Sequence, residues 1–193
     1  MSLAALHPVD ASMMTTTHIA LGLSLAYGLA ALLPDYTTLV LGVAVVASIF
    51  PDFDVVFEHR KTLHFPVYFG VAALPLAVLV ILVPSQLVVG LFTFLAFAWV
   101  HSISDIFGGG AEAHPWEGPS TRAVFLHPAD RWIPPTRGVR YDGSPEDLAL
   151  CILFSIPAFV VATGALFYLL IVNIALSVVY TVIRKQVPDF FPA

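Results

Sequence analysis

The sequence predicts an all-α, multi-pass transmembrane helical bundle of about five spans, arranged as two hairpins with short loops plus a C-terminal helix and a long interfacial cap loop. Hydrophobic residues make up 59% of the 193 residues and charged residues only 11%, whereas an ordinary soluble domain carries about 25% charged residues. Mean hydropathy is +0.90. Acidic residues outnumber basic ones by 13 to 8, so no nucleic-acid partner is expected.

Five apolar runs are candidate spans, at about 18–33, 36–50, 66–83, 86–107 and 149–172, compared with the ~20 residues that cross a hydrocarbon core. Pro34-Asp35 joins the first two runs and Pro84-Ser85 joins the third and fourth. Such tight connections predict two helical hairpins. Gly22, Ala26 and Ala30 recur at four-residue spacing in the first run, which predicts close packing against another helix.

The C-terminal part begins with Ser144-Pro145-Glu146-Asp147, a typical helix start. The apolar run that follows extends to Ile183 and is too long for one crossing. We expect a break near Asn173, and a sixth short segment stays open as an alternative. Asp142 and Asp147 are expected at the surface. The chain is interpreted as one membrane-embedded domain with a core at 14–107, the cap loop at 108–148 and a C-terminal helical segment at 149–186.

The distribution of basic residues predicts the orientation in the cell membrane. Both hairpin tips lack Lys and Arg, whereas the opposite side carries six basic residues: Arg60, Lys61, Arg122, Arg131, Arg137 and Arg140. The positive-inside rule therefore places this side, with the N-terminus, in the cytoplasm. The N-terminus lacks the basic region of a cleaved signal peptide, and Met13 or Met14 is an alternative start to Met1.

Ionisable side chains recur at one depth of the predicted bundle. His18, Asp52 and His101 each lie 15 or 16 residues from a hairpin tip, which is about 22–24 Å along a helix. His64 fits the same plane if the third span begins at Pro66. Because such residues are costly near hydrocarbon, their shared depth indicates a common functional site.

Two short motifs within this set are typical of metal ligands. His101 and Asp105 form HxxxD, which puts both side chains on one helix face. Asp52 and Asp54 form PDFD and face the same way if the backbone there is extended. Taken alone, HxxxD is more often a hydrogen-bonded pair and PDFD a solvated turn, but their joint placement favours a shared site. Mixed His and carboxylate ligands suit one or two divalent ions, with zinc expected first and manganese or iron as alternatives.

Other polar residues near this plane receive less weight. His59 and Arg60 are interpreted either as catalytic helpers or as interfacial anchors. Glu112, His114 and Glu117 cluster in the cap loop, where they could supply a further ligand or contact a substrate.

Several of these motifs together are similar to those of a known family. They are Thr17-His18, Pro51-Asp52-Phe53-Asp54, His59-Arg60 followed by His64, and His101 with Asp105 before a Gly-rich stretch leading to Pro115-Trp116. Over about residues 14–148 the chain resembles the YdjM-like family of membrane-bound, metal-dependent hydrolases. That family is itself distantly similar to the zinc-dependent phospholipase C and single-strand nuclease group.

The resemblance implies metal roles for six residues and an anion contact for Arg60. The six are His18, Asp52, Asp54, His64, His101 and Asp105. One departure concerns the third span, where the family commonly has Thr-His-Ser and this chain has Leu63-His64-Phe65.

From the residues and the resemblance, we expect hydrolysis of a phosphoester by a metal-activated water. Asp54 or Asp105 is the expected general base, and an amphiphilic substrate in the surrounding lipid is the expected partner. The alternatives are an ion or proton transporter, a haem-binding electron carrier that uses His18 and His101, and a non-catalytic membrane scaffold. The sequence leaves the substrate and the oligomeric state open.

Overall fold

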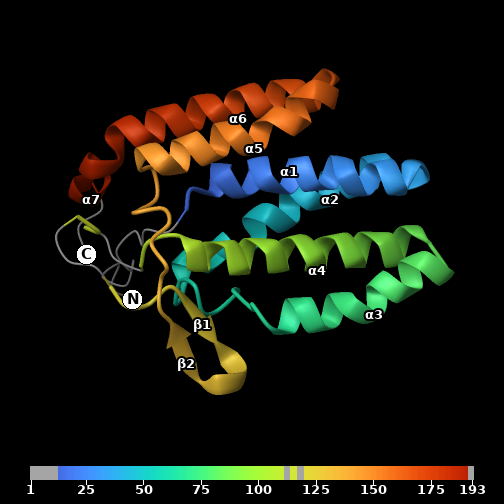
Figure 1. The fold of residues 1–193 in the computed structure, drawn as a ribbon, viewed down its shortest axis with the longest axis horizontal. Helices are drawn as coiled ribbons and strands as arrows, with labels where there is room; N and C mark the ends of the chain where they lie inside the picture. The colour runs from blue at the N-terminus through green and yellow to red at the C-terminus, as the bar shows by residue number, and fades with distance from the viewer. Residues whose placement is uncertain (1–12, 111–113, 117–119, 191–193) are drawn as a thin grey trace.

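A computed structural model describes residues 13–110, 114–116 and 120–190, and within them six long helices form a bundle with a small two-stranded ribbon at one end (Figure 1). This architecture confirms the all-α class. The bundle consists of three successive hairpins whose tips lie at one end, at the right of Figure 1, while the ribbon lies toward the other end.

The first hairpin joins helix α1 (Thr15–Leu32) to helix α2 (Thr37–Ile49) through a short 3-10 turn, Pro34–Tyr36. The two helices are closely packed, because a Cβ added at Gly22 would lie 2.0 Å from the Oγ atom of Ser48 on α2. Ala26 and Ala30 are buried on the same face of α1. The small-residue stripe therefore lets the two helices approach, as predicted.

The second hairpin joins helix α3 (Tyr68–Leu82) to helix α4 (Gln86–Ser104). The Ser85 hydroxyl caps α4 by accepting a hydrogen bond from the backbone N–H of Val88. α4 continues into a 3-10 turn, Asp105–Phe107. α3 starts two residues later than the predicted third span, directly after the Pro66-Val67 pair.

The third hairpin corrects the prediction for the C-terminal part. Helix α5 (Pro145–Val161) and helix α6 (Gly164–Ile183) are separated at residues 162–163, and Gly164 has a positive φ of 56°. Asn173 lies inside α6, where its side-chain amide donates to the backbone carbonyl of Thr16 at 2.8 Å. The expected break near Asn173 is wrong because this contact with the N-terminal end of α1 satisfies the amide within the helix. α6 is followed by a 3-10 turn, Arg184–Gln186, and a short helix α7 (Val187–Phe190).

Four segments of the described chain are long and apolar enough to cross a membrane: Thr15–Leu32, Pro34–Val56, Gln86–Phe107 and Gly164–Gln186. α3 is apolar but has only 15 residues, about 22 Å of helix. Large apolar side chains are exposed over the outer surface, with Ile81, Val160 and Leu32 each about 80% exposed. The protein is therefore suited to a lipid environment.

The ribbon consists of strand β1 (Val124–Leu126) and strand β2 (Arg131–Ile133), which pair antiparallel. Backbone hydrogen bonds join the surrounding cap to the ends of the helices, from Phe125 to Arg60 at 3.0 Å and from Thr136 to Ile106 at 2.9 Å. The cap is thus fixed over the end of the bundle at which η2 (Phe50–Val56), a 3-10 continuation of α2, also lies.

Candidate metal centre

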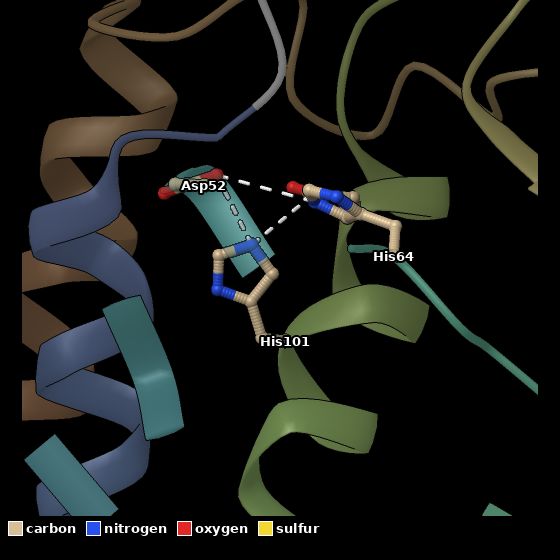
Figure 2. Close-up of side chains that lie close together, drawn as sticks. Asp52, His64 and His101 are labelled. Carbon is tan, nitrogen blue, oxygen red and sulfur yellow. Dashed lines mark hydrogen bonds and ion pairs between the residues drawn. The ribbon is translucent and has the colours of Figure 1, made fainter. Parts of the chain in front are cut away.

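Four ionisable side chains meet at the cap end of the bundle: Asp52, His64, His101 and Asp105. Figure 2 shows Asp52, His64 and His101 pointing toward one another. The His101 Nε2 atom lies 3.2 Å from the Asp52 Oδ1 atom and 3.4 Å from the Asp105 Oδ2 atom. The His64 Nε2 atom lies 3.0 Å from the same Asp105 oxygen and 4.0 Å from Asp52 Oδ1. Ligand atoms around a tetrahedral zinc ion are about 3.3–3.4 Å apart, so these spacings suit a single ion.

Hydrogen bonds at the far side of each imidazole fix which nitrogen faces the cluster. The His101 Nδ1 atom lies 2.7 Å from the backbone carbonyl of Ser48 and must donate its proton there, because a carbonyl only accepts. In the neutral ring the Nε2 atom then carries a lone pair. This Nε2 atom is buried and has no hydrogen-bond partner among the described residues, although two carboxylate oxygens face it.

His64 has the same arrangement, with its Nδ1 atom 2.9 Å from the Asp54 Oδ2 atom. Two imidazole nitrogens and two carboxylate oxygens therefore converge on one buried point. Electron pairs brought together in this way need a cation between them, either a proton or a metal ion. Burial lowers the pKa of the His64 imidazole, but the carboxylates of Asp105 and Asp54 outweigh burial and raise it above its ordinary value.

The local backbone explains how the chain presents these residues. His101 is in the last turn of α4 and Asp105 is its C-cap residue, so the HxxxD spacing keeps both on one face. Asp52 and Asp54 lie in η2, a 3-10 helix opened by Phe50-Pro51. The expected extended backbone is wrong here. Because a 3-10 helix has about three residues per turn, residues two apart diverge, and Asp54 points to a different side of His64 from Asp52.

Asp54 is fully buried and contacts two histidines. Its Oδ1 atom lies 2.6 Å from His59 Nδ1, and its Oδ2 atom accepts from the backbone N–H of Leu63 at 3.0 Å in addition to contacting His64. Asp54, His59 and His64 form a second group with ligand spacing. Since His64 directs its other nitrogen toward Asp52 and Asp105, Asp54 is in the position of a carboxylate that orients a candidate ligand, the His64 imidazole.

His18 contacts the cluster through Asp105. Its Nε2 atom lies 3.0 Å from the Asp105 Oδ1 atom, its Nδ1 atom lies 3.1 Å from the Ser104 hydroxyl, and its ring stacks on His101 at 3.8 Å between centroids. The structure thus brings all six residues expected at the metal site into one contiguous network. Within it, the four residues with converging atoms are His64, His101, Asp52 and Asp105.

Arg60 is fully buried but lies in a different set of contacts. It has a positive φ of 61°, and its guanidinium donates to the backbone carbonyl of Gly109 at 3.1 Å and, at 3.5 Å, to that of Ala123. These bonds join the segment after η2 to the cap. Among the other cap residues with expected roles, His114 is exposed and contacts the Trp116 ring, whereas Glu112 and Glu117 lie outside the described residues.

A second buried polar network joins the cap to α5 and α6, and it corrects the prediction that Asp142 and Asp147 lie at the surface. Asp147 accepts from the backbone N–H groups of Met14 and Gly143 and from the Thr17 hydroxyl, at 2.7–3.0 Å. Asp142 forms an ion pair with Arg184 at 2.7 Å. No local pattern in the sequence marks either residue as buried, because their partners come from the two ends of the chain.

An open groove of about 490 Å³ lies beside the cluster and is lined by Asp52 and His59 together with residues of α1 and α6. Asp52 is the cluster member with the most exposed side chain, at 19%, while those of His64, His101 and Asp105 are fully buried. Asp52 is therefore the point at which a small molecule in the groove reaches the cluster.

Comparisons with known proteins give no further assignment, because the chain matches no family model, no curated protein and no solved structure.

Proposed function

We propose that the protein is a membrane-bound, metal-dependent hydrolase that cleaves a phosphoester at the cytoplasmic face of the cell membrane. The observation that carries the proposal is the convergence of two imidazole nitrogens and two carboxylate oxygens on one buried point. The His101 Nε2 atom has no hydrogen-bond partner there. A buried imidazole nitrogen that faces two carboxylates and has no hydrogen-bond partner is in the position of a metal ligand.

The donor set fits a divalent ion. Two imidazoles and two carboxylates suit zinc, and also manganese or iron, better than a metal that prefers thiolates. A divalent ion bound there would act as a Lewis acid toward a phosphoryl oxygen and lower the pKa of a water molecule. The group of four supplies ligands for one ion, and a second ion would need Asp54 and His59, which form a separate group with His64.

The chain's own residues would divide the remaining tasks. Asp54 holds the His64 ring through its Nδ1 atom, and the Ser48 carbonyl holds the His101 ring in the same way. Asp54 and Asp105 were the expected general bases, but both are fully buried and contact histidines through both oxygens. Asp52 faces the groove, and we infer that it is the carboxylate that water and substrate reach.

The distribution of charge supports the cytoplasmic placement of this end. Six basic residues belong to the segments on the cap side of the helices: Arg60, Lys61, Arg122, Arg131, Arg137 and Arg140. The turns at 33–36 and 83–85 contain no basic residue. The positive-inside rule then orients the cap and the cluster toward the cytoplasm.

The experiment that tests the proposal is a hydrolysis assay with purified, metal-loaded protein. Nitrophenyl phosphomonoesters and phosphodiesters provide a colorimetric readout, and a long-chain phospholipid in vesicles provides a membrane substrate. Asp105→Asn removes a carboxylate of the cluster, and Asp35→Asn, at an exposed hairpin tip, is the matched control. Metal-dependent hydrolysis that persists in Asp35→Asn and disappears in Asp105→Asn is expected, whereas metal-loaded wild-type protein that hydrolyses none of these substrates would contradict the proposal.

A further inference from the structure

The groove beside the metal centre has walls from three of the four membrane-length segments. Its lining residues come from Met13 and the first turn of α1, from η2 and the segment that follows it, and from α6. On α6 the lining residues Leu176, Val179, Tyr180 and Ile183 recur at helical spacing and define one face. This face extends for about 10 Å along the helix.

The lining of the groove is divided into a polar end and an apolar wall. Asp52, His59 and the hydroxyl of Thr15, which donates to Asp52, lie at the end next to the cluster. On the α6 wall, Leu176, Val179 and Ile183 are aliphatic, whereas the Tyr180 hydroxyl donates to Asp142, which also lines the groove. Leu176 and Val179 are each 56% exposed and Ile183 is 38% exposed, so the groove is open along its length rather than enclosed.

The position of the open side of the groove indicates which kind of molecule binds there. α6 and α2–η2 are both in segments apolar enough to span a membrane, so the open side between them faces the region where lipid chains lie. A peptide would bring a backbone N–H and C=O group at every residue, each of which needs a partner, and the aliphatic side chains of Leu176, Val179 and Ile183 offer none. A hydrocarbon chain needs no such partners, and it gains from each methylene group that it buries.

We propose that this groove holds the hydrocarbon chain of a membrane lipid whose phosphate head group lies at Asp52. This inference rests on the proposed function for the reaction at the head group and adds the substrate class and the direction of entry. The lipid enters sideways from the bilayer between η2 and α6. Its chain lies along Leu176, Val179 and Ile183, and its phosphoester bond is at the end of the groove next to Asp52.

Two adjacent valines of α6 provide a matched test. Val179 lines the groove, whereas Val178 is also exposed, at 42%, and is not among the lining residues. A tryptophan at position 179 would fill the chain site, and one at position 178 would face away from it, about 100° further around the helix. Ile183→Trp and Val182→Trp form a second pair with the same logic, in case the first groove variant does not fold.

The expected result is a difference between substrates. Val179→Trp lowers hydrolysis of a long-chain phospholipid in vesicles by about tenfold or more, because the chain loses its binding site. Hydrolysis of a short nitrophenyl phosphoester stays within about twofold, because the head-group end is unchanged. Val178→Trp leaves both rates within about twofold of wild type. Equal vesicle-substrate rates for the two tryptophan variants would overturn the inference.

A binding measurement separates this inference from the proposed function. Native mass spectrometry counts long-chain phospholipid bound to wild type, Val178→Trp and Val179→Trp. If no substrate is hydrolysed but phospholipid bound to wild type and Val178→Trp is lost in Val179→Trp, the chain site stands and the hydrolase proposal fails. If all three proteins retain phospholipid equally, or none binds it, the chain site is refuted whatever the activity.

Discussion

Replacing Asp54 with asparagine should weaken metal binding without abolishing it. Asp54 uses both oxygens, one toward His59 Nδ1 at 2.6 Å and the other toward His64 Nδ1 at 2.9 Å. Asparagine keeps one acceptor oxygen and places an amide NH₂ group against the other imidazole, whose Nδ1 atom is then no longer held by an acceptor. His64 loses the negative charge that fixes its ring whichever way the amide is turned.

The expected magnitude follows from that one contact. A hydrogen bond to a charged group is worth about 1.5–3 kcal/mol, which corresponds to about 10–100-fold in affinity. Loss of a partner that orients a ligating histidine costs a similar 10–100-fold in metal proteins. We therefore expect zinc affinity to fall by about 10–100-fold in Asp54→Asn.

The assay is a competition titration of zinc between the detergent-purified protein and a chromophoric chelator. Circular dichroism monitors folding, and Asp35→Asn serves as the control at an exposed site. Asp105→Asn supplies the reference for removal of a direct ligand. A loss of zinc in Asp54→Asn as complete as in Asp105→Asn would refute the positioning role and make Asp54 a ligand, and an unchanged affinity would refute any role in the centre.

Three further predictions concern stability. Gly22→Ala should lower stability by about 1–3 kcal/mol through overpacking, because its Cβ would lie 2.0 Å from Ser48 Oγ. Gly28→Ala is the control and should not lower stability in this way, because a Cβ there has nothing within 4 Å. Thermal unfolding of the two variants tests the difference. Arg184→Met should cost about 3–5 kcal/mol because it leaves Asp142 buried without its ion pair. Arg140→Met breaks only the exposed pair with Glu146 and should change the melting temperature far less, because solvent screens an exposed ion pair; equal melting shifts would contradict this ranking. Burial raises the pKa of Asp147, in the first turn of α5, to about 7, so its contribution to stability is complete below about pH 4 and is lost as the pH rises toward 7. Asp147→Asn should remove this loss of unfolding free energy between about pH 4 and pH 7. Chemical unfolding at a series of pH values measures it, and a variant with the same pH dependence as wild type would contradict the prediction.

The sequence was most informative where a local pattern determines the structure. Apolar runs and proline-containing connections located α1 to α4 because hydropathy and turn chemistry act over a few residues. The HxxxD motif placed His101 and Asp105 on one face because helix geometry depends only on spacing. The shared depth of His18, Asp52 and His101 indicated a common site for the same reason: rise per residue is constant in a helix.

What the sequence did not predict depends on tertiary contacts. Asn173 suggested a helix break, but it lies in α6 with its amide bonded to the Thr16 carbonyl. Asp54 and Asp52 diverge because η2 is a 3-10 helix, and no pattern in PDFD distinguishes that from an extended turn. Asp147 is buried by donors from Met14 and Thr17, more than 100 residues away in the sequence. The groove needs α6 beside η2, an arrangement that no single segment encodes.

The most direct test of the central claim is the metal content of the detergent-purified protein, measured by inductively coupled plasma mass spectrometry. Wild type is compared with folded His101→Ala and Asp52→Ala, and with His114→Ala as a control for removing an exposed histidine outside the cluster. Near-stoichiometric zinc, manganese or iron is expected in wild type and His114→Ala, and almost none in the two cluster variants. A wild-type protein that is free of metal after purification and after metal is added back would contradict it.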